Sequence, residues 1–213
     1  MYTLEKQQVI DAGIKLHDYH LISLSGGNVS LRINDLVLVT PSGMTYQELV
    51  PEDIVVVKLD GTVVEGERRP SVDTIALLHI YNNMPEVKAV IHTHQVYATA
   101  VGLIADTLPA VVTTLVNATL GPVTVAPFSS AASLDMGIEA VKHLNGKRAV
   151  ILKQHGVITV GATLKEALYA AVYMEDAAKT YLVARAVGET PIMDAKQIQD
   201  AVDSFKVYGQ IKK

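Results

Sequence analysis

The chain has 213 residues, of which 49% are hydrophobic and 19% are charged, with a formal net charge of −4 at pH 7. This length suits one domain with a substantial core, and the composition excludes a disordered chain. No segment approaches the roughly 18 apolar residues of a membrane span, and the scattered basic residues form no stripe for nucleic acid. The chain has no cysteine and its N-terminus lacks a signal-peptide pattern, so we expect one cytoplasmic domain over residues 1–213.

The predicted elements alternate between helices and short strands. In chain order, they are a helix over 4–20, strands over 29–33, 36–40, 54–59 and 62–64, a helix over 72–83, a strand over 87–91, a helix over 95–104, a strand over 123–126, a helix over 131–144, strands over 149–152 and 157–160, and helices over 163–187 and 194–205. Hairpin turns at Asn34-Asp35 and Asp60-Gly61 favour antiparallel pairing. The pattern predicts a single α/β domain with a mixed, mainly antiparallel central sheet flanked by helices.

Three histidines form the strongest chemical signal. His92 and His94 come at the end of the apolar run 87–91, and side chains two residues apart on a strand point to the same face. His155 follows a second apolar run, 149–152. If these strands end side by side, three neutral imidazoles converge and leave a coordination position open, as in a catalytic zinc site. Taken alone, the first pair is also typical of ordinary surface or packed histidines.

Two loops offer groups that could hold an anion. Residues 26–30 supply backbone amides and an amide side chain, and residues 40–43 supply two hydroxyls and a glycine; consecutive amides form a positive concavity. Ser71, just ahead of a predicted helix, could donate to the same anion or simply cap the helix. Asp73 in the first turn of that helix is either a metal ligand, a general acid or base, or a charge that complements the helix dipole.

The order of five motifs resembles the class II aldolase/adducin family. The motifs are Gly-Gly-Asn-Val-Ser, Thr-Pro-Ser-Gly, Glu-Gly-Glu-Arg-Arg-Pro-Ser-Val-Asp-Thr, Val-Ile-His-Thr-His and Gln-His-Gly. The resemblance runs from about residue 5 to residue 209. It implies a class II aldolase-like fold and a homotetramer with its active sites at the subunit interfaces.

The resemblance also assigns roles to individual residues. It implies that His92, His94 and His155 bind one zinc ion, although three imidazoles also suit Mn²⁺ or Co²⁺. Asp73 is the implied acid or base, or a fourth metal ligand, and Tyr208 reaches the site of a neighbouring subunit. The implied phosphate-binding residues are Gly27, Asn28, Ser42, Gly43 and Ser71.

The implied activity is that of a zinc-dependent aldolase. It would cleave a ketose phosphate resembling L-fuculose 1-phosphate to dihydroxyacetone phosphate and an aldehyde, through a metal-stabilised enediolate. An L-ribulose-5-phosphate 4-epimerase, which breaks and remakes the same kind of bond, is the alternative. A sugar-acid phosphate decarboxylase and a non-catalytic adducin-like scaffold are less favoured.

Four positions bear on the choice between these members. Asp73 followed by Thr matches the epimerases, since the fuculose-phosphate aldolases carry Glu there. Asn117 stands where the epimerases have a catalytic Asp, and an amide cannot transfer that proton. Thr113 matches the position of a tyrosine that the aldolase uses. Val72 replaces a serine, which predicts a weaker or altered grip on the phosphate.

Overall fold

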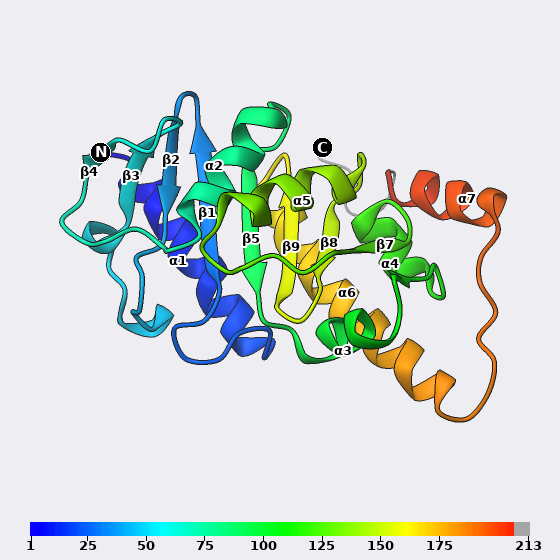
Figure 1. Cartoon of the computed structure of the whole chain (residues 1–213). Helices are drawn as coiled ribbons and strands as arrows, with labels where there is room; N and C mark the ends of the chain where they lie inside the picture. Colours follow the sequence, from blue (N-terminus) through cyan, green and yellow to red (C-terminus); the bar gives the residue numbers. More distant parts are fainter. Residues whose placement is uncertain (207–213) are drawn as a thin grey trace.

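A nine-stranded sheet organises the chain in the computed structural model, which describes residues 1–206 (Figure 1). In order across the sheet, the strands are β4 (Val63–Glu65), β3 (Val55–Lys58), β2 (Leu36–Val39), β1 (Asn28–Ile33), β5 (Ala89–Thr93), β9 (Gly156–Gly161), β8 (Ala149–Leu152), β7 (Val123–Ala126) and β6 (Thr107–Leu108). Neighbouring strands pair antiparallel except β7 and β8, which are parallel. The predicted mixed, mainly antiparallel sheet is therefore confirmed.

Helices cover both faces of the sheet. They are α1 (Thr3–Asp18), α2 (Thr74–Asn83), α3 (Val96–Ile104), α4 (Thr113–Thr119), α5 (Leu134–Leu144), α6 (Leu164–Arg185) and α7 (Ala195–Lys206), with short 3₁₀ turns at Tyr46–Glu48 and Pro51–Asp53. Helices α2 and α5 pack on one face, and α1, α3, α4 and α6 on the other (Figure 1). Helix α7 packs on α4. No helix among residues 1–206 is long and apolar enough to cross a membrane.

Strand alternation decides which residues of β5 face which layer. Val90 packs with α2 and α5, whereas Ala89 and Ile91 pack with α1 and α6. Because alternate side chains of a strand share a face, His92 points to the same side as Val90. The sequence pattern thus places His92 on the face where α2 begins.

Most predicted elements are present, with shifted ends. Helix α5 begins at Leu134 rather than at residue 131, because the Ser133 side chain caps it by accepting from the Met136 N–H at 3.3 Å. At the start of α6, the Thr163 hydroxyl accepts from the Glu166 N–H at 3.2 Å, as in half of a capping box. Helix α4 and strand β6 were not predicted.

Candidate metal centre

The structure brings His92, His94 and His155 together at the ends of their strands. His92 is the fourth residue of β5, and His94 follows that strand directly. His155 lies in the turn between β8 and β9, where its N–H donates to the Leu152 carbonyl at 3.1 Å. Strand β5 pairs with β9 rather than with β8, and this places the turn beside His94. The candidate ligand nitrogens all lie within 4.8 Å of one another.

Glycines allow the neighbouring strands to approach this cluster. A Cβ atom on Gly156 would overlap the Thr93 carbonyl oxygen, and one on Gly27 would overlap the His92 carbonyl oxygen. Gly27 also has a φ of +71°, which side-chain-bearing residues rarely adopt. The two glycines therefore let the segments that flank β5 reach its backbone at the point where the histidines emerge.

One hydrogen bond determines which ring nitrogen of His92 carries the proton. His92 Nδ1 lies 2.8 Å from the Val157 carbonyl oxygen, which can only accept, so this nitrogen carries the proton. His92 Nε2 is then unprotonated and has a free electron pair, and it lies 3.1 Å from His94 Nε2. Two nitrogens each about 2.0–2.1 Å from one zinc ion can take such a separation. A backbone carbonyl that orients a ligand imidazole is a common feature of metal sites.

Burial keeps the three imidazoles neutral at pH 7. It lowers the pKa of His92 to about 4, against the opposing effect of the Asp73 charge. Partial desolvation of the rings also lowers the pKa of His94 and of His155 below the usual value. Neutral imidazoles are the form that binds metal, so the donor set fits a divalent cation. His92 is fully buried, whereas His155 is partly exposed and His94 exposed, which leaves the cluster accessible from one side.

Asp73 lies beside the histidines rather than acting only as a helix-terminus charge. It immediately precedes α2, which begins at Thr74, and makes no side-chain cap to that helix. Its buried carboxylate accepts from Asn28 Nδ2 at 2.9 Å and from the Ala132 N–H at 3.0 Å. Oδ2 lies 4.0 Å from His92 Nε2. The structure thus joins Asp73 to the cluster, as a metal ligand or an acid or base would require.

The second predicted anion loop is tied to the segment that carries Ser71. The Ser71 N–H donates to the Thr40 carbonyl at 3.0 Å, and the Ser42 N–H donates to the Arg69 carbonyl at 2.9 Å. These bonds place the 40–43 loop next to Ser71, and the Ser71 hydroxyl accepts from the Asp73 N–H at 3.4 Å. Gly43 has a φ of +75° and open space where a Cβ would lie. Tyr208 lies outside the described residues.

The sequence pattern did not predict two backbone groups of the site. The Val157 carbonyl orients His92, and the Ala132 N–H holds Asp73. Backbone groups leave no signature in a residue pattern, and only the fold brings them here. Asn117 lies elsewhere: with its amide nitrogen facing two carbonyls, it donates to Thr113 at 3.2 Å and to Ala201 at 2.6 Å. In this orientation, the amide connects α4 to α7.

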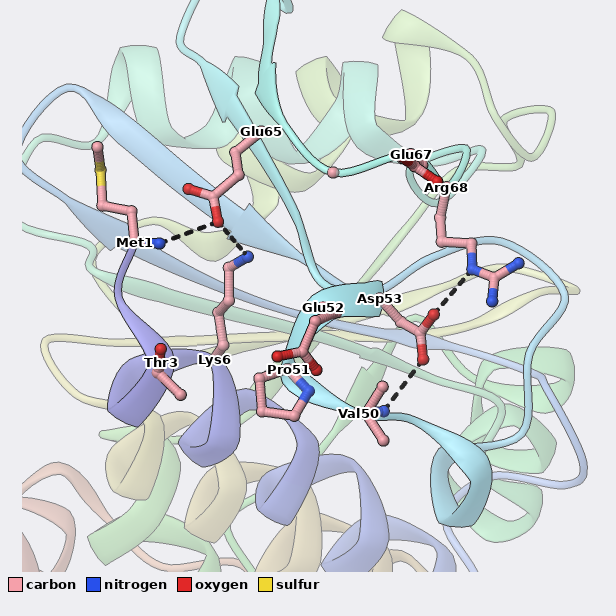
Figure 2. Close-up of a pocket in the computed structure, with 11 residues that line it drawn as sticks. Met1, Thr3, Lys6, Val50, Pro51, Glu52, Asp53, Glu65, Glu67 and Arg68 are labelled. Atoms are coloured by element: carbon pink, nitrogen blue, oxygen red, sulfur yellow. Dashed lines mark hydrogen bonds and ion pairs between the residues drawn. The ribbon is translucent and has the colours of Figure 1, made fainter.

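A separate cavity of about 720 Å³ lies near the N-terminus (Figure 2). Five of its charged groups form ion pairs with one another. Glu65 Oε1 accepts from Lys6 Nζ at 2.9 Å and from the Met1 amino group at 3.1 Å, and Asp53 accepts from Arg68 Nε at 2.8 Å. These partners lower the pKa of Glu65 and of Asp53. The Lys6–Glu65 pair joins α1 to β4, and the cavity lacks the histidines.

Comparisons with known proteins agree with the fold. The family model for the class II aldolase and adducin N-terminal domain matches residues 7–182. A 5-deoxy-D-ribulose 1-phosphate aldolase of Bacillus thuringiensis serovar kurstaki is 32% identical over 209 residues, 97% of each chain. An L-ribulose-5-phosphate 4-epimerase of Salmonella paratyphi A is 35% identical over 208 residues, 89% of this chain and 90% of that one. A solved L-fuculose 1-phosphate aldolase has a TM-score of 0.90 at 32% identity, covering 94% of this chain and 95% of that chain.

These matches extend over nearly the whole chain and define an enzyme of the aldolase type. The chain belongs to the class II aldolase and adducin family. Class II aldolases depend on a metal, and the three histidines are a group that could bind one.

Proposed function

We propose that this enzyme is a zinc-dependent aldolase that cleaves a ketose phosphate resembling L-fuculose 1-phosphate to dihydroxyacetone phosphate and an aldehyde. The observation that carries the proposal is the accessible cluster of three neutral imidazoles with a buried carboxylate 4.0 Å from His92. His92, His94 and His155 would hold the ion, with Mn²⁺ or Co²⁺ as alternatives. A bound ion would act as a Lewis acid for the charge that develops when the carbon–carbon bond breaks.

The protein's own groups supply the remaining functions. Asp73, fixed by two N–H donors, is placed to move a proton or to serve as a fourth ligand. Tyr208 of a neighbouring subunit is the second proposed proton-transfer group. The residues proposed to hold the phosphate are Gly27, Asn28, Ser42, Gly43 and Ser71. Val72, which is exposed between Ser71 and Asp73, contributes no hydroxyl to that site.

The epimerase is the second candidate. The 35% identity to a protein named L-ribulose-5-phosphate 4-epimerase favours it, as does Asp73 followed by Thr. The position of Asn117 argues against it, because this residue has no carboxyl group and its amide joins α4 to α7. A non-catalytic scaffold is disfavoured because all three histidines are present and converge. Nothing in the site favours a decarboxylase.

Exposed apolar residues near the site groups in the sequence support the proposed homotetramer with active sites between subunits. Exposed apolar side chains occur close in sequence to the groups of the site: Leu24, Val72, Ile75, Val96 and Phe128. We call these five residues the apolar rim. A contiguous patch of exposed apolar groups is typical of an interaction surface, and we propose that the rim forms one. A neighbouring subunit placed on the rim would cover the open side of the cluster, and the Tyr208 of that subunit is the group proposed to act there.

Product analysis tests the function directly. The zinc-loaded protein is offered L-fuculose 1-phosphate and L-ribulose 5-phosphate, and the products are followed by NMR. We expect release of dihydroxyacetone phosphate from the first sugar. Conversion of the second sugar to D-xylulose 5-phosphate without release would establish the epimerase instead. His92→Ala and His155→Ala should lose bound zinc and turnover together. The control is His20→Ala: His20 is exposed and precedes β1, and its replacement should affect neither zinc binding nor turnover.

A further inference from the structure

Asn28 occupies a buried position directly beside the central histidine. It is the first residue of β1 and is fully buried. In the β1–β5 register, Asn28 lies opposite His92. Its Nδ2 atom donates to Asp73 Oδ2 at 2.9 Å, the same oxygen that lies 4.0 Å from His92 Nε2. The amide therefore contacts the carboxylate on the side that faces the histidines.

The other carboxylate oxygen is held by a different segment. Asp73 Oδ1 accepts from the Ala132 N–H at 3.0 Å, and Ala132 has a φ of +58°, an uncommon conformation for a residue with a Cβ. The carboxylate thus has one donor from β1 and one from the loop before α5. Removal of the Asn28 donor would leave the carboxylate held at Oδ1 alone, and Oδ2 would be free to turn away from His92.

The second polar atom of the amide is unsuited to phosphate. Asn28 Oδ1 is buried and has no hydrogen-bond partner among residues 1–206. A carbonyl oxygen accepts hydrogen bonds and repels the oxygens of an anion. The Nδ2 atom already donates to the Asp73 carboxylate. The other polar atom of the side chain, Oδ1, can only accept a hydrogen bond.

We propose that Asn28 is a positioning residue, which holds the Asp73 carboxylate toward the histidine cluster and acts on the reaction through that carboxylate rather than by binding the substrate's phosphate. This inference rests on the proposed function and revises the role of one residue in it. Residues that orient the groups around a metal typically change metal affinity or activity by about 10- to 100-fold when replaced.

A double-mutant cycle separates the two roles. Asn28→Leu removes the donor while keeping the number and branching of the side-chain heavy atoms, and Asp73→Asn removes the charge. We expect Asn28→Leu to lower kcat by roughly tenfold or more and to weaken zinc binding, measured against a chelator, while KM for the sugar phosphate changes less than about threefold. In the Asp73→Asn background, the same replacement should have no further effect on kcat or on the zinc Kd.

The control is Thr159→Val, which removes a buried hydrogen bond, from Oγ1 to the Ala167 carbonyl at 2.9 Å, on the opposite face of the sheet. It should reduce thermal stability without changing kcat or the zinc Kd. If the leucine variant does not fold, Asn28→Ala takes its place in the cycle.

Three results would overturn the inference. The first is a KM of the Asn28→Leu protein that rises for the phosphorylated sugar but not for its dephosphorylated form. The others are effects of the two replacements that multiply in the double variant, and a zinc Kd unchanged by Asn28→Leu. If the wild-type protein cleaves neither sugar phosphate, the proposed substrate fails. The zinc Kd cycle still decides the role of Asn28 in that case, because it needs no turnover.

Discussion

The protonation of single histidines links the site to the stability of the protein. A histidine in an unfolded chain titrates near pH 6.5, whereas burial holds the pKa of His92 in the folded protein at about 4. Between these values the unfolded state binds more protons than the native state. The free energy of unfolding of the zinc-free protein should therefore fall as the pH is lowered through this window, and the contribution of His92 should level off below about pH 4.

Denaturation of the zinc-free protein at pH 7 and pH 5 measures this effect. We expect His92→Gln to lose less stability over this range than the wild type, by on the order of 1–2 kcal/mol. The comparison removes the contribution of other titrating groups, which both proteins share. Equal losses in the two proteins would show that His92 is not held neutral by burial.

Sequence patterns predicted the chemically distinctive residues of the site but not their partners. The spacing of His92 and His94 on a strand predicts convergence from local geometry alone. Asp73 had equally good local explanations, and only its bonds to Asn28 and Ala132 place it beside the histidines. These contacts join residues 45 and 59 positions apart, so no local pattern could reveal them.

At the scale of elements, the long periodic helices and the hairpin strands were predictable, and the short elements were not. Helix α4 has 7 residues, and a helix of this length has little stability of its own. Leu115 and Val116 instead bury it against α6 and α7. Strand β6 has 2 residues and exists through its pairing with β7. Tertiary packing, rather than propensity, determines both elements.

The turn between β8 and β9 is the element on which the position of His155 depends. In Gly156→Ala, the added Cβ would overlap the Thr93 carbonyl and lie 3.1 Å from His94 Cδ2. Because the contact is with backbone, β9 must shift away from β5. We expect a loss of about 1–3 kcal/mol, or about 2–4 °C of Tm per kcal/mol, together with weaker zinc binding.

Gly188→Ala is the matched control for this variant, since a Cβ there meets nothing within 4 Å. It should leave both the Tm and the zinc affinity close to those of the wild type. A Gly156→Ala protein with unchanged zinc affinity would show that the histidine cluster tolerates movement of the turn.

At the scale of the whole molecule, the exposed side of the histidine cluster and the apolar rim favour an interface between copies of the chain, and the proposed assembly has four copies. Light scattering on the purified protein should give four times the mass of the 22.9 kDa chain. Ile75→Asp tests whether the rim forms the contact, because Ile75 is exposed in the first turn of α2. An acidic residue there is favourable to the helix dipole, so a change in mass would not come from loss of the helix.

We expect Ile75→Asp to shift the mass toward that of a monomer or dimer, since the introduced charge would be buried between subunits without a partner. Val187→Asp places the same charge at an exposed apolar residue after α6, outside the rim, and should keep the tetrameric mass. An Ile75→Asp protein that remains tetrameric would remove the rim from the interface. A wild-type monomer that still cleaves its substrate would show that one chain holds all the groups the reaction needs, and would exclude Tyr208 of a neighbouring subunit from the mechanism.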